Sequence, residues 1–196
     1  NSATVFEDDP FERTAATLKL GYDFSKTFNI NTFANYSRFK NQYDTGIWTD
    51  GVNLSSTENI KLGINPEYKY KKGSVVLIAS AASTDINREN TSFPSTASSN
   101  TITADLYNKY KFTNYLWAVA GVNFNEQKME QASVPYGAST LVTSLYERDT
   151  ETTTIDPYLN LTYFSNFGLT INAGVRLNNH SNYGSHFVYN FNPSYN

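Results

Sequence analysis

Residues that could perform chemistry are few in this chain. Two histidines, His180 and His186, lie six residues apart, a spacing that fits neither a helical metal motif nor a catalytic pair. The sequence contains no cysteine, which excludes disulfides, thiolate metal sites and a cysteine nucleophile. Asp50 or Ser181 beside a histidine would be the parts of a hydrolytic site, but the sequence supplies no geometry for one. We therefore expect neither an enzyme nor a cofactor.

Four carboxylates gather near the start of the chain, at Glu7, Asp8, Asp9 and Glu12. Carboxylate oxygens are the ligands that calcium prefers, but a dedicated calcium loop alternates its carboxylates and includes a glycine, and neither feature occurs here. We expect a solvated loop and no metal site. Asp8 and Asp9 are the calcium candidates if one exists.

Aromatic and arginine side chains occur in three polar segments, 44–57, 88–100 and 129–150. Ring stacking and charge pairing with arginine are two ways to hold an aromatic chelate or a corrin. The same side chains could instead pack one loop against another. The resulting candidates for ligand binding are Trp48, Asp50, Arg88, Tyr136, Tyr146 and Arg148.

Between these segments run long stretches in which apolar and polar residues alternate. In 168–178, for example, Leu169, Ile171 and Val175 fall on one face and polar residues fall on the other, as in a strand with one apolar face. The stretches meet in pairs at short polar turns near 25, 71, 113 and 165. The pattern predicts hairpins at about 14–43, 57–87, 101–128 and 151–181, with a ninth strand from about 185.

Short turns at one end and long loops at the other are typical of a transmembrane β-barrel. The strands would be roughly 11 to 16 residues long, whereas soluble strands average about 5 to 6 and spanning strands need about 9 to 11. We therefore expect an all-β fold in which 1–196 is part of an antiparallel transmembrane barrel of about nine strands. An odd count and a start without methionine suggest a piece of a larger protein.

The alternation assigns most charged residues of the strands to one face. That face should line the barrel lumen, while the apolar face meets lipid. Near their turns, 75–87 and 115–128 are apolar on both faces, so their facing is not predicted. The residues expected to face the lumen are Lys19, Asp23, Lys61, Glu67, Asp105, Asp156 and Arg176.

Aromatic residues cluster beside the short turns of all four hairpins. Such rings anchor a barrel at the boundary between lipid and water. The alternative is that aromatics are simply common in strands. The expected girdle on the periplasmic side contains Tyr22, Phe24, Tyr68, Tyr70, Tyr110, Phe112, Trp117, Tyr163 and Phe167.

A net charge of -3 gives no basic field for a nucleic-acid backbone, so nucleic acid is not an expected partner. No segment reaches the roughly 20 apolar residues of a spanning helix. Barrel strands escape that criterion because only every second residue meets lipid.

One run near the end of the chain carries a family resemblance. It reads GVRLNNHSNYGSHFVYNFNPSY at 174–195 and resembles the barrel of TonB-dependent outer-membrane receptors, above all the cobalamin and siderophore receptor branch. In that branch a strand ending in Gly-x-Arg precedes an acidic or amidic stretch with histidine, then an aromatic residue, Gly, Ser and a new strand. Here Asn178 and Asn179 stand where Asp is frequent.

The resemblance implies a barrel of about 22 strands in the bacterial outer membrane, filled by a plug that this chain lacks. It implies uptake of a scarce solute, such as a ferric siderophore or cobalamin, driven by TonB. The implied partners are outer-membrane lipid, the solute, TonB through the plug, and a surface-exposed lipoprotein as a further candidate. Two alternatives stay open, a passive porin-like channel and a soluble β-sandwich that binds a ligand.

Overall fold

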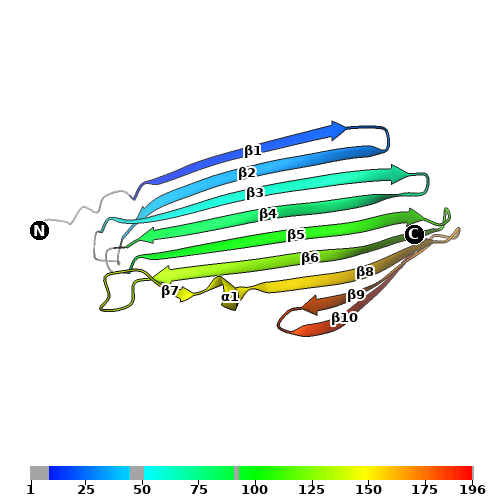
Figure 1. The fold of residues 1–196 in the computed structure, drawn as a ribbon. Helices are drawn as coiled ribbons and strands as arrows, with labels where there is room; N and C mark the ends of the chain where they lie inside the picture. The colour runs from blue at the N-terminus through cyan, green and yellow to red at the C-terminus, as the bar shows by residue number, and fades with distance from the viewer. Residues whose placement is uncertain (1–8, 45–50, 91–92, 196) are drawn as a thin grey trace, which may run out of the picture.

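The computed structural model describes residues 9–44, 51–90 and 93–195, and these form one antiparallel sheet (Figure 1). The prediction of an all-β antiparallel fold is confirmed. Strand order follows the sequence from β1 to β6 and then through β8, β9 and β10. The elements are β1 Phe11–Asp23, β2 Phe28–Tyr43, β3 Asn53–Tyr70, β4 Gly73–Glu89, β5 Ser95–Lys111, β6 Leu116–Ser133, β7 Val142–Leu145, α1 Glu147–Thr150, β8 Thr152–Phe164, β9 Leu169–His180 and β10 Gly184–Tyr195.

The described residues form a single curved layer. Each strand contacts its two sheet neighbours, and no second sheet packs against either face in this part of the chain (Figure 1). A β-sandwich requires two sheets packed face to face, so that alternative lacks its defining feature here. Very few side chains are fully buried, and the apolar face is left open.

The strands at the long-loop end extend further than the alternation predicts. β3 starts at Asn53 and β5 at Ser95, within serine- and threonine-rich stretches that were expected to be loops. Threonine is β-branched and fits a pleated strand, and both stretches find partners across the ladder. The segment 129–150 also holds structure, because β7 pairs with the end of β6 across a bulge at Gln131/Ala132, and α1 follows.

Hydroxyl side chains shape three of the four short turns. Ser25 Oγ accepts hydrogen bonds from the backbone N–H groups of Thr27 and Phe28, at 3.2 and 3.0 Å. Thr113 and Ser165 act in the same way in the third and fourth turns. In the second turn Gly73 is required, because a Cβ there would collide with the carbonyl oxygen of Lys109.

The pairing register gives the sheet one apolar and one polar face. Leu62 pairs with Ala34 and Ala81, for example, while Gly63 on the other face pairs with Phe33 and Ser80. All seven residues expected to face the lumen share the polar face, and the lumen itself stays a prediction. The register also fixes the facing of β4 and β6, which the sequence left open.

The apolar face is a band of limited height. It covers 28–36 in β2, 60–70 in β3, 102–110 in β5 and 155–163 in β8. These lengths match the about 9 to 11 residues that a tilted strand needs to cross a bilayer. Above the band the same face becomes charged at Arg38, Glu58 and Asp85, so the strands project beyond it.

No helix in the described ranges is long and apolar enough to cross a membrane.

Two prolines interrupt the ladder without shifting it. Pro66 pairs with Ile30 of β2 but has no ladder partner in β4. The nearest ladder pairs on either side, Ile64 with Ala79 and Glu67 with Val76, have the same register. Pro157 pairs with Val122 of β6 and lies in a similar gap toward β9. Proline lacks the N–H that a ladder pair needs, and at both sites the ladder resumes in the same register without a bulge.

The β9–β10 hairpin is shorter than the hairpins before it. Its strands have 12 residues each, against 18 in β3 and β6. Gly184, at φ 75°, ends the tight turn that joins them at the long-loop end (Figure 1).

We predict that Leu62→Arg costs about 2 to 4 kcal/mol of folding free energy in lipid vesicles, because Leu62 lies at mid-height of the apolar band. Leu54→Arg is the matched control, since Leu54 lies on the same strand and face above the band. Its cost should stay within about 1 kcal/mol. Urea unfolding in vesicles measures both, and equal costs would contradict the assignment of the band to lipid.

Candidate functional site

The ligand candidates lie at the long-loop end, where the structure brings two of them together. Tyr146 precedes α1, and the guanidinium carbon of Arg148 lies 4.8 Å from its ring centroid. Arg88 is the penultimate residue of β4 and is exposed, and Tyr136 is 97 % exposed in the loop before β7. Trp48 and Asp50 lie outside the described residues. Tyr146 and Arg148 together offer a ring and a cation.

Hydrogen bonds and ion pairs hold this α1 segment against β6. Thr150 Oγ1 accepts from the Met129 N–H at 2.9 Å and donates to the Met129 carbonyl at 2.5 Å. Lys128 Nζ lies 3.3 Å from a Glu126 carboxylate oxygen and 3.5 Å from one of Glu151. The hydrogen bond and charge of Glu126, with the charge of Glu151, raise the pKa of Lys128. Tyr146 and Arg148 are thus presented from an anchored segment.

A second cluster lies on the polar face, around Asp156. This carboxylate is 5 % exposed, and its Oδ2 accepts from Arg176 Nη2 at 2.5 Å. Its Oδ1 accepts the backbone N–H of Asn179 at 2.9 Å, at the ladder gap beside Pro157. The carboxylate therefore supplies the acceptor that the interrupted ladder lacks. Both charged residues were expected on this face, but their pairing was not.

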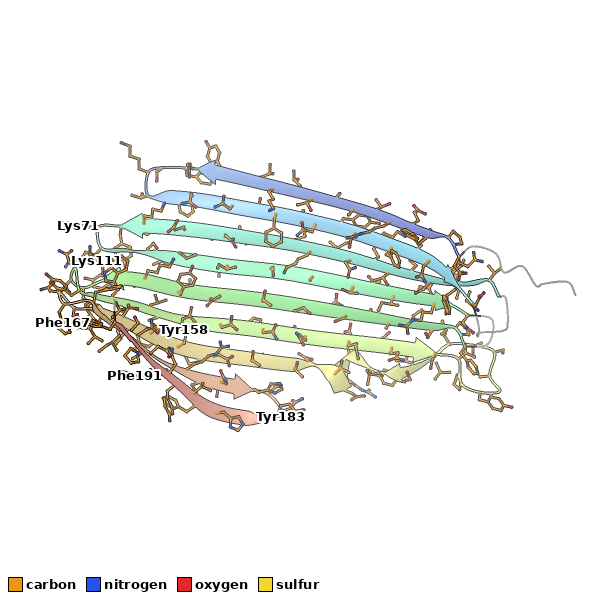
Figure 2. All side chains as sticks on the ribbon, turned by 180° about the vertical axis from the view of Figure 1, so that it is seen from behind. Lys71, Lys111, Tyr158, Phe167, Tyr183 and Phe191 are labelled. Atoms are coloured by element: carbon orange, nitrogen blue, oxygen red, sulfur yellow. The ribbon has the colours of Figure 1, made fainter. Side chains whose placement is uncertain are left out.

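Neighbouring polar side chains continue this cluster across the sheet. Tyr158 Oη donates to Asp105 Oδ1 at 3.0 Å (Tyr158 is labelled in Figure 2). Asn160 and Asn172 exchange hydrogen bonds at 3.1 and 2.9 Å. Asp105, Tyr158, Asn160 and Arg176 line a cavity of about 310 Å³. The alternation placed these asparagines on the polar face, but only the strand register shows which of them meet.

Two glycines make room for these side chains. A Cβ at Gly121 would lie 2.7 Å from the Tyr158 ring and from the Leu106 carbonyl oxygen. A Cβ at Gly174 would collide with Asn190 and come within 2.8 Å of Asn160. A larger residue at either position would collide with these side chains in their present positions.

The aromatic residues at the short-turn end divide between the two faces. Tyr22, Tyr68, Tyr70, Tyr110 and Tyr163 share the apolar face. Phe24 and Phe112 contact this group edge-on, each with its ring centroid 4.7 Å from that of a neighbouring tyrosine. Phe167 is exposed in the fourth turn, at the same end of the sheet as the labelled Lys71 and Lys111 in Figure 2.

Trp117 was expected in the girdle, but the register places it on the face opposite the five tyrosines. It pairs with Lys111 and Thr162 on the polar face, where its ring lies 6.3 Å from that of Phe164. The stretch at the start of β6 is apolar on both faces, so alternation could not decide its facing. The number of residues in the third turn sets the facing of Trp117, because it makes Trp117 the ladder partner of Lys111.

Metal and histidine chemistry gain little support from the geometry. Within the part of the chain that the structure describes, no three His, Asp or Glu side chains gather as a metal site. Asp9 is exposed and Asp8 lies outside the described residues. The ring centroids of His180 and Tyr183 lie 4.6 Å apart, and His180 Nδ1 accepts the Asn182 N–H at 3.1 Å, which ties it to the turn after β9.

Two solved structures share this fold. The siderophore receptor PiuA from Acinetobacter baumannii aligns with a TM-score of 0.67 at 11% identity, covering 95% of this chain and 39% of that one. BauA, the ferric preacinetobactin receptor from the same organism, aligns with a TM-score of 0.65 at 12% identity, covering 96% and 37%. This chain thus spans about two fifths of their length. Both proteins are named as receptors.

No protein-family model and no curated protein sequence matches the chain. At identities this low, the likeness establishes the fold of the wall and leaves the ligand to be found by experiment.

We predict that Asp156→Ala destabilises the folded protein more than Arg176→Gln. The alanine leaves the Asn179 N–H and the charged Arg176 without their acceptor. The substitution should therefore lower the free energy of unfolding by about 2 kcal/mol. Arg176 is part-exposed, at 44% of its side chain, so its loss should cost about 1 kcal/mol. Urea unfolding of both variants in vesicles measures the difference. An equal or reversed order would contradict the role of Asp156 in the interrupted ladder.

Proposed function

We propose that this chain is part of the barrel wall of a TonB-dependent receptor in the bacterial outer membrane, which takes up a ferric siderophore. The single observation that carries the proposal is the apolar band across one continuous sheet that aligns with siderophore receptors over nearly its whole length. The polar face would line the lumen, and the short turns would lie in the periplasm.

In this proposal the ligand is met at the long-loop end. A ferric siderophore is often an anionic chelate with aromatic groups, which suits the stacked Tyr146 and Arg148. Arg88 adds a second exposed cation at the end of β4. Cobalamin, whose corrin ring would stack in the same way, is the alternative cargo. TonB would supply energy through a plug, and a surface lipoprotein would assist at the loops.

The proposal is tested with the full-length gene in iron-limited cells that lack their own receptors. Uptake of radioactive iron as one member of a siderophore panel, abolished when tonB is deleted, is the expected result. Uptake that persists without TonB would indicate a passive channel. Transport of labelled cobalamin alone would move the assignment to the other branch.

We predict that Arg148→Ala raises the KM of this uptake about tenfold, because a loop cation that pairs with an anionic chelate is lost. Lys26→Ala is the control, since Lys26 lies in the first short turn at the opposite end of the sheet. Its KM should be unchanged. An unchanged KM for Arg148→Ala would remove this residue from the binding site without affecting the transport assignment.

A further inference from the structure

At the long-loop end, β6 changes its ladder partner along one edge (Figure 1). β8 pairs with β6 as far as Gln127, and β7 takes over the same edge from Gln131 onward. Met129 lies between the two partners, and its backbone N–H and C=O point to this edge. In an antiparallel ladder, such a residue exchanges both hydrogen bonds with one residue of the neighbouring strand. Neither β7 nor β8 supplies that residue.

The side-chain hydroxyl of Thr150 takes the place of the absent strand partner. The register of β8, extended by two residues from the pair of Gln127 with Thr152, would set Thr150 opposite Met129. Thr150 is instead the last residue of α1, so its backbone is not in the ladder. Its Oγ1 accepts the Met129 N–H at 2.9 Å and donates to the Met129 carbonyl at 2.5 Å. A hydroxyl can satisfy both groups because it is a donor and an acceptor at once.

The same hydroxyl lies against the turn that carries the candidate ligand residues. Thr150 Oγ1 is 3.1 Å from the Glu147 carbonyl oxygen and 3.5 Å from that of Tyr146. The Asp149 N–H donates to the Tyr146 carbonyl at 3.0 Å, which closes the turn. α1 has four residues, too few for a helix to be stable by itself. Its place on the sheet therefore depends on contacts such as those of Thr150.

The turn restrains the ring and the cation relative to each other. The guanidinium carbon of Arg148 lies 4.8 Å from the Tyr146 ring centroid, and its Nε lies 3.6 Å from Asp149 Oδ1. A long side chain that is already restrained loses less entropy when it binds a ligand. The nearby ion pair of Lys128 with Glu151, at 3.5 Å, is part-exposed and contributes little to the anchor. Thr150 thus makes the stronger link between the turn and β6.

We propose that Thr150 is a positioning residue, whose hydroxyl replaces a strand partner for Met129 and thereby fixes Tyr146 and Arg148 for the ligand. The proposal rests on the proposed function, in which this pair meets the transported chelate. Threonine and serine can both fill the role. Valine has the same branched shape but neither donates nor accepts a hydrogen bond, so it cannot.

The anchor is tested without a ligand, by hydrogen exchange of the full-length protein in lipid vesicles with residue-level mass spectrometry. In T150V the amides of Met129 and Asp149 should exchange at least about fivefold faster, because their segment has lost the hydroxyl. T153V is the matched control, since Thr153 lies three residues away in β8 and its hydroxyl makes no hydrogen bond within the described ranges. Unchanged exchange of the Met129 amide in T150V would overturn the proposal.

The positioning role is tested by iron-siderophore uptake in the same cells as the transport assay. T150V should raise the KM about threefold to fivefold and leave the maximal rate unchanged, whereas T150S should stay near the wild-type KM. In an R148A background T150V should add nothing further, because it acts through Arg148. An unchanged KM, or effects that simply add, would overturn the proposal.

Failure of the two proposals can be told apart. A wild-type protein that takes up no siderophore would reject the proposed function, and the exchange of Met129 and Asp149 would still decide whether Thr150 holds the turn. Normal wild-type uptake with a T150V variant of unchanged KM would reject only the role of Thr150.

Discussion

The structure depends on one constraint, that each strand must hydrogen-bond to its neighbours along its whole length. A backbone inside lipid has no water to satisfy its N–H and C=O groups, so the ladder must do it. With pairing continuous from β1 to β6 and on to β8, β9 and β10, a single register fixes which face each side chain occupies. The apolar band and the polar clusters both follow from that register.

The two breaks in the ladder show how strict this constraint is. Proline has no N–H to donate, and at Pro66 and Pro157 the sheet leaves a few ladder pairs unmade while it keeps the register. In the gap beside Pro157, the Asp156 carboxylate accepts the backbone N–H of Asn179, which lacks a ladder acceptor there. Arg176 stabilises the same carboxylate. An ionic cluster on the polar face is thus also a repair of the backbone network.

The sequence predicted the strands well because alternation with a period of two depends only on local order. Where both faces are apolar, as around Trp117, that signal vanishes and only the number of residues in the turn sets the facing. The pairing of Asp156 with Arg176, and the contact of Tyr158 with Asp105, depend on lateral register between strands.

The short β9–β10 hairpin gives the outer rim of this wall an uneven height. Its strands are 12 residues long where β3 and β6 have 18, a difference of about 20 Å along the strand direction. The tall strands and their loops stand as a screen on one side, and the rim steps down beside β9 (Figure 1). In the proposed receptor, a solute at the long-loop end would meet less wall beside β9 and β10 than beside β3 and β6.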